Sequence, residues 1–150
     1  MRNRVCRALV AGAAAVSMLA VAVSSADAHS LNLKESASMH KVGGKGFTIN
    51  ESGNVSGSIK GKMSLTITVS GLTHVTARLT VYPSGGGSIN GTASGSYRVA
   101  GAVAHFSGTA NLKGGSGKYK KASGSGLKFS GVVHRGSDAV SVSVSGNFSY

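Results

Sequence analysis

Residues 55–69 have the sequence VSGSIKGKMSLTITV, in which an apolar residue or glycine alternates with Ser, Thr or Lys throughout. Successive side chains of a β-strand point to opposite faces. A period of two therefore places the apolar side chains on one face and the polar ones on the other. The stretch predicts a long strand with one buried face and one solvated face.

The same alternation recurs in the rest of the chain after residue 28. Short segments rich in Gly and Ser separate the alternating runs, and none of these runs has the 3.6-residue period of a helix. Seven or eight strands joined by such turns predict a meander of antiparallel hairpins. The further alternating runs are residues 75–81, 89–99, 102–112, 127–133 and 140–148.

The predicted fold class is all-β, a single antiparallel up-and-down β-barrel of about eight strands over residues 29–150. Closure into a barrel pairs every strand edge, whereas an open sheet would expose edges rich in Val, Ser and Thr. A two-sheet sandwich, which the same periodicity allows, is the alternative, but short sequential connections favour the barrel. Glycines on the apolar side of the alternation would let long strands bend: Gly57, Gly61, Gly91, Gly95, Gly108, Gly131 and Gly146.

Residues 1–28 have the three parts of a helical secretory signal peptide. Three arginines precede an uncharged apolar run at residues 8–23, and Ala26-Asp27-Ala28 offers small residues for cleavage. A membrane anchor is the alternative, but the run is short and is interrupted by Ala, Gly and Ser. Cleavage would remove the one cysteine, Cys6, and would leave a secreted protein with no membrane span.

The chain is strongly basic, with sixteen Lys and Arg against four Asp and Glu. Three of these basic residues and one acidic residue lie in residues 1–28, which leaves a net charge of +10 for residues 29–150. The basic residues are scattered and no aromatic series is interleaved with them, so we expect no nucleic-acid partner. One cluster surrounds a predicted turn and is a candidate contact for an anionic cell-surface polymer, although solubility alone is an alternative role: Lys113, Lys118, Lys120 and Lys121.

Few side chains could carry catalysis or bind a metal ion. We expect Glu51 and Asp138 in turns, and Glu35 in a strand, where it either points inward or is solvated at a frayed edge. Four histidines are spaced 29 to 34 residues apart, but no His-x-His or His-x₃-His pair occurs, which favours solvated surface histidines over a metal site. The sequence therefore predicts no catalytic residue, no metal ligand and no cofactor. The four histidines are His40, His74, His105 and His134.

Residues 108–126, GTANLKGGSGKYKKASGSG, contain a glycine-rich turn followed by Tyr119. This stretch resembles the hairpin of the allene oxide cyclase and dirigent-like barrel superfamily, in which a strand ends in Gly-Gly-Thr-Gly-x-Tyr. Here Ser116 replaces the Thr, and Lys121 stands where a Gly is usual. The resemblance covers residues 108–150 and implies a barrel that holds an apolar or phenolic ligand.

Two functions from different classes follow from the predicted barrel. The first is a secreted, non-enzymatic binding or surface-interaction module with a small apolar cavity for a hydrophobic ligand. The alternative, implied by the resemblance, is a cyclase-like or dirigent-like isomerase that acts on a hydrophobic ligand. A buried, desolvated carboxyl group beside an apolar cavity would favour the isomerase, and an interior lined only by apolar side chains would exclude it.

Overall fold

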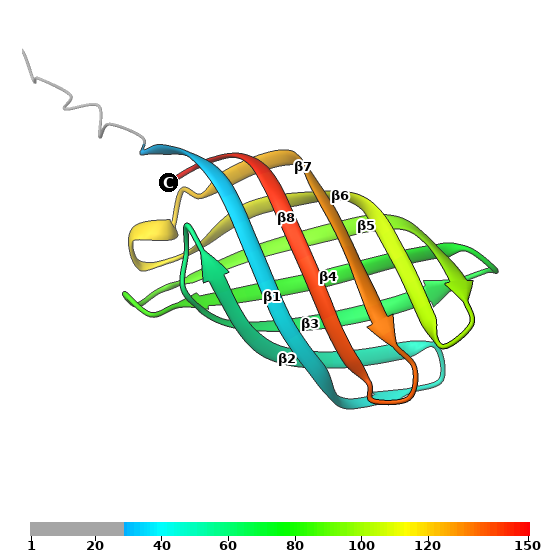
Figure 1. The fold of residues 1–150 in the computed structure, drawn as a ribbon. Coiled ribbons are helices and arrows are strands. Elements are labelled where there is room, and N and C mark those ends of the chain that lie inside the picture. Colours follow the sequence, from blue (N-terminus) through cyan, green and yellow to red (C-terminus); the bar gives the residue numbers. More distant parts are fainter. Residues whose placement is uncertain (1–28) are drawn as a thin grey trace, which may run out of the picture.

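The alternating runs become eight β-strands in the computed structural model of the protein, which describes residues 29–150 (Figure 1). The predicted signal peptide lies outside the described residues. A three-residue 3-10 turn, η1 (Gly117–Tyr119), is the one helical element described, and within residues 29–150 no helix is long and apolar enough to span a membrane. The strands are β1 (Ser30–Lys45), β2 (Thr48–Gly57), β3 (Gly61–Ser70), β4 (His74–Pro83), β5 (Ser88–Ala100), β6 (Val103–Ser116), β7 (Ser123–His134) and β8 (Ala139–Ser149).

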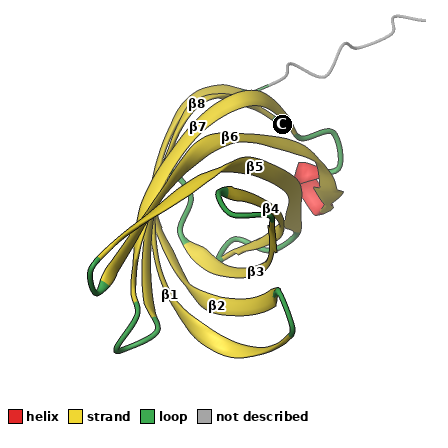
Figure 2. Ribbon diagram, turned by 90° about the vertical axis from the view of Figure 1, so that its right-hand side faces the viewer, coloured by secondary structure: helices red, strands yellow, loops and turns green. Residues whose placement is uncertain are grey.

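The strands form a closed antiparallel up-and-down barrel, which confirms the predicted barrel over the sandwich. Each strand pairs with the next, and β8 returns to pair with β1 from Ser30↔Ser149 to His40↔Ala139. Figure 2 shows the strands curving around a common interior. Each of the eight strands therefore has a hydrogen-bonded neighbour on both sides within residues 29–150, and the barrel has no open edge strand.

The prediction of one long strand over residues 55–69 is wrong, because the chain reverses direction inside it. Strand β2 ends at Gly57, β3 begins at Gly61, and Val55 pairs with Gly61 across the hairpin. Residues paired across a hairpin share a face, and this pairing joins two positions of the same parity. The alternation therefore continues through the turn, and Ile59 within the turn is buried.

One end of the barrel is sealed by aromatic and aliphatic side chains. This end carries the first and last described residues, η1 and the β2–β3 and β4–β5 connections (Figure 1). Tyr119 is buried there and packs against Tyr150 with ring centroids 4.7 Å apart, and Phe148 lies 5.6 Å from the same ring. Four of the six side chains that are at most 2% exposed lie toward this end, namely Leu33, Ile89, Leu127 and Phe148, whereas Ala110 lies in the middle of β6 and Val140 near the opposite end of β8.

The opposite end carries the tips of four hairpins and is called the rim here. The tips are the β1–β2, β3–β4, β5–β6 and β7–β8 connections. Backbone hydrogen bonds join some of these tips to their neighbours: Val69 N donates to Phe47 O at 2.9 Å, and Arg135 N donates to Ala102 O at 3.0 Å. The rim is therefore a continuous structure rather than a set of independent loops.

Candidate functional site

The interior of the barrel holds a cavity of about 360 Å³. Its walls come from the inward faces of β2 to β8, and it reaches residues next to the rim, such as Val69, Val75 and Val99. Almost all lining side chains are apolar, and they include Met63, Leu65, Ile67, Leu79, Phe106, Phe129, Val133, Val142 and Val144.

The cavity remains open because one part of its wall carries small side chains. Ala77, Ala93 and Ala110 lie side by side on β4, β5 and β6 in the paired register, and all three line the cavity. In the next inward row of β5 and β6, Gly95 pairs with Gly108. Because none of these residues reaches far into the barrel, they leave space in the interior for a ligand.

Glu51 is the carboxyl group that faces this apolar cavity. The sequence prediction that Glu51 lies in a turn is wrong: it lies within β2, between partners Lys41 on β1 and Leu65 on β3. Its side chain is 4% exposed, and its Oε2 atom is buried without a hydrogen-bond partner. Asn50, Ser52 and Gly53 around it are typical of turns, but Glu51 has the same parity as the inward-facing Val55, a signal that could have placed it inside.

The environment of Glu51 favours the neutral form of its carboxyl group. Desolvation by burial raises the pKa of Glu51 above its ordinary value, and the nearby Asp138 carboxylate raises it further, while His40 and Lys41 act in the opposite direction. A buried polar atom without a partner costs stability, and such groups are concentrated at functional sites. Glu51 therefore combines the geometry and the chemistry expected of a ligand-binding residue.

Glu35 lies in β1 on the parity of Leu33, half-buried, as the inward-pointing alternative predicted, and its Oε2 atom is buried without a hydrogen-bond partner. Its Oε1 atom accepts a 2.7 Å hydrogen bond from the backbone N–H of Ile59, so the carboxyl group holds the β2–β3 turn at the sealed end. Burial raises the pKa of Glu35, against hydrogen bonds from Ile59 and Ser58 that lower it. Glu35 is half-buried and does not line the cavity, which assigns it to the architecture of the barrel.

The other predicted polar groups lie on the surface. Asp138 lies in the β7–β8 turn, as expected, with a φ of 52°. The four spaced histidines are exposed and come from four different strands, β1, β4, β6 and β7. Within residues 29–150, no three His, Cys, Asp or Glu side chains are grouped so that they could hold a metal ion.

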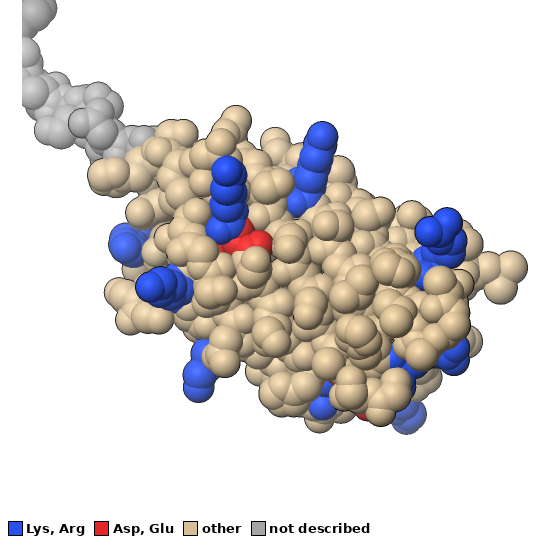
Figure 3. Space-filling model, viewed as in Figure 1, with Lys and Arg blue, Asp and Glu red and all other residues tan. Residues whose placement is uncertain are grey.

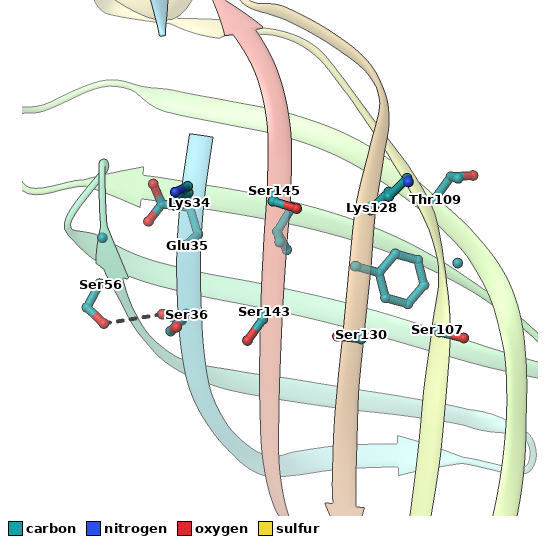
Figure 4. Close-up of a pocket in the computed structure, with 14 residues that line it drawn as sticks. Lys34, Glu35, Ser36, Ser56, Ser107, Thr109, Lys128, Ser130, Ser143 and Ser145 are labelled. Atoms are coloured by element: carbon teal, nitrogen blue, oxygen red, sulfur yellow. Dashed lines mark hydrogen bonds between the residues drawn. The ribbon is translucent and has the colours of Figure 1, made fainter. Parts of the chain in front are cut away.

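A larger but shallow groove crosses the outer face of β2, β1, β8, β7 and β6. Figure 4 shows it lined by serine hydroxyls and by Lys34 and Lys128, with Ser56 Oγ donating to Ser36 O at 3.4 Å. The groove measures about 840 Å³, more than twice the volume of the interior cavity. Its serine and lysine side chains are exposed, so water competes for every polar contact there. The apolar interior cavity is therefore the better candidate site.

The predicted lysine cluster surrounds the β6–β7 connection at the sealed end. All four lysines are exposed. Lys113 lies near the end of β6, Lys118 lies in η1, and Lys120 and Lys121 follow η1. The Lys118 amino group lies 5.1 Å from the centre of the Tyr119 ring and 5.5 Å from that of Tyr150. The cluster is therefore remote from the rim, at the other end of the barrel.

Replacing Lys113, Lys118, Lys120 and Lys121 together with Gln should lower the salt concentration at which the protein elutes from an anionic matrix. Exposed charges attract a polyanion only within a Debye length, about 8 Å at physiological ionic strength, so clustered charges act together. The control replaces the exposed Lys41, Lys45, Arg98 and Arg135 with Gln, which removes the same charge from the rim, at the opposite end of the barrel. An equal shift for both variants would show that net charge, and not the cluster, causes retention.

Neither a protein-family model, nor a curated protein, nor a solved structure matches the chain. The fold and the cavity define its class: an all-β, closed, eight-stranded antiparallel barrel with an apolar interior cavity. The resemblance of residues 108–150 to the allene oxide cyclase and dirigent-like superfamily stays a prediction.

Proposed function

We propose that the protein is a secreted binding module that holds a small hydrophobic ligand with one polar group inside the barrel. The observation that carries this proposal is the apolar cavity with the unpartnered Glu51 carboxyl group in its wall. The apolar walls would exclude water from the ligand, and Glu51 would pair with its polar group.

The size and composition of the cavity fit a ligand of this kind. Small-molecule pockets measure about 300–1,000 Å³ and combine mostly apolar walls with a few polar groups that fix the orientation of the ligand. At about 360 Å³ the cavity is near the lower end of that range. A neutral Glu51 carboxyl group can donate a hydrogen bond to a carbonyl or hydroxyl oxygen and accept one from a hydroxyl group.

Glu51 also favours a second candidate function, a cyclase-like or dirigent-like isomerase. A carboxyl group with a raised pKa in an apolar site can transfer a proton to a bound substrate, as a general acid does. The test is to supply an allene oxide and to measure the optical purity of the cyclised product. A racemic product from both the wild-type protein and Glu51→Gln would exclude this activity for that substrate.

Narrowing the cavity should weaken ligand binding without unfolding the barrel. Ala93→Leu adds three carbon atoms beside Ala77 and Ala110, where the wall is lined with small side chains. We expect this variant to enhance the fluorescence of 8-anilinonaphthalene-1-sulfonate several-fold less than the wild-type protein does. The midpoint of thermal unfolding should change little, because the new side chain occupies empty space.

The matched control is Ser94→Leu, which places the same side chain on the outer face of β5 at an exposed position. This variant should enhance dye fluorescence as the wild-type protein does. If Ala93→Leu still enhances the fluorescence fully, the dye binds elsewhere and the proposed use of the cavity is wrong.

A further inference from the structure

The rim of the barrel carries large apolar side chains that are exposed to solvent. Phe47 in the β1–β2 tip is 78% exposed and Leu72 in the β3–β4 tip is 92% exposed. Val42 and Val99, at 59% and 49%, lie on the same end of β1 and β5. Four of the five large apolar residues exposed in residues 29–150 are therefore at the rim, and only Tyr82 lies toward the other end.

The turns that carry Phe47 and Leu72 hold them in place. Gly46 and Gly71, immediately before them, have φ values of +61° and +65°, which suit tight turns. The Phe47 carbonyl accepts from Val69 N, and the Thr73 carbonyl accepts from Tyr97 N at 2.8 Å, so each tip is tied to a neighbouring strand. The two apolar side chains are thus presented on anchored turns.

Basic side chains surround these apolar tips. Lys41, Lys45, Arg98 and Arg135 are exposed on β1, β5 and the β7–β8 tip. Among the described residues of the four hairpin tips at the rim, Asp138 is the one acidic residue, and it is exposed. In Figure 3 Lys and Arg side chains lie toward both ends of the visible face, with a broad uncharged surface between them.

Apolar side chains among cations match one kind of partner, the surface of an anionic lipid bilayer. Lys and Arg are attracted to anionic headgroups, at about 1 kcal/mol for each residue near the surface. Apolar side chains enter the boundary between headgroups and acyl chains and contribute in proportion to the area they bury. The rim supplies both contributions, and the cavity reaches Val69, Val75 and Val99 next to it.

We propose that the rim docks on anionic lipid bilayers, with Phe47 and Leu72 inserted among the headgroups and Lys41, Lys45, Arg98 and Arg135 against them. In this orientation the sealed end faces water and the end of the barrel nearest the cavity faces the membrane. A hydrophobic ligand could then pass between the bilayer and the cavity without crossing water. The docking surface stands on the exposed rim, independently of what the cavity holds.

Vesicle co-sedimentation of residues 29–150 tests this docking. The protein should bind vesicles of phosphatidylglycerol and phosphatidylcholine more tightly than vesicles of phosphatidylcholine alone, and added salt should weaken the binding. The double variant Phe47→Ser/Leu72→Ser should bind the anionic vesicles about tenfold more weakly, because it lacks the two apolar side chains that the bilayer would bury. Unchanged binding by this variant would overturn the proposal.

Two controls locate the interaction on the barrel. Tyr82→Ser, which removes an exposed aromatic ring away from the rim, should bind as the wild-type protein does. Lys41→Gln/Lys45→Gln should weaken binding, whereas replacing the sealed-end lysines Lys120 and Lys121 with Gln should not. If only the variant of Lys120 and Lys121 loses binding, the sealed end contacts the membrane and the proposal is wrong. Dye binding without vesicles tests the cavity separately, so either proposal can fail alone.

Discussion

Replacing Gly61 with Val should lower the free energy of unfolding by about 1–3 kcal/mol, the usual cost of overpacking. Gly61 begins β3 and pairs with Pro83 at the end of β4. A Cβ atom at Gly61 would collide with the carbonyl oxygen of Tyr82 and would lie 2.9 Å from Pro83 Cα. Both neighbours are backbone atoms, which cannot rotate away, so relief requires β3 and β4 to separate.

The matched control is Gly136→Val in the β7–β8 turn. An added Cβ at Gly136 meets no atom within 4 Å, and its φ is not among the positive values. Its midpoint of urea unfolding should therefore stay close to that of the wild-type protein. Equal midpoints for Gly61→Val and the wild-type protein would mean that the close β3–β4 approach is absent in solution.

The sequence pattern predicts the barrel well because side-chain alternation is a local property. In residues 75–81 and 140–148, the residues predicted to face inward are buried or half-buried in the structure. The division between β2 and β3 is hidden, because the turn around Ile59 keeps the parity of the alternation. Pattern alone shows which face a residue occupies, but not where a strand reverses.

The candidate site was harder to predict, because it depends on register between strands. Ala77, Ala93 and Ala110 are unremarkable as separate alanines, and their pairing across β4, β5 and β6 makes them one wall of the cavity. Local composition predicts a turn at Glu51, because its neighbours are residues that favour turns. Its burial is decided by β1 and β3 on either side of it, which local composition does not show.

The stability of the barrel should rise when Glu51 is replaced with Leu. A buried polar atom without a partner costs about 1–3 kcal/mol, and Leu has no polar atom to satisfy. We expect Glu51→Leu to increase the free energy of unfolding at pH 7 by an amount in that range. Glu51→Gln should give a smaller gain, because its amide is uncharged but still needs hydrogen-bond partners.

This gain should depend on pH in a defined direction. The pKa of Glu51 is raised in the folded state, so the folded protein binds the proton more tightly than the unfolded chain. The contribution of Glu51 to the stability of the wild-type protein therefore rises as pH falls from above the folded pKa toward 4.5, the ordinary value of the carboxyl group. The advantage of Glu51→Leu should shrink over the same range, which urea unfolding at a series of pH values would measure.

Glu35→Leu is the contrasting variant. Glu35 also has a raised pKa and a buried Oε2 atom without a partner, but its Oε1 atom accepts a hydrogen bond from Ile59 N. Its loss leaves the backbone N–H of the buried Ile59 without its 2.7 Å partner, so this variant should be less stable than the wild-type protein. If Glu51→Leu is also less stable at every pH, Glu51 supports the fold. If it alone is more stable, the barrel carries a carboxyl group that weakens it, and binding a ligand at Oε2 is the role that would offset this cost.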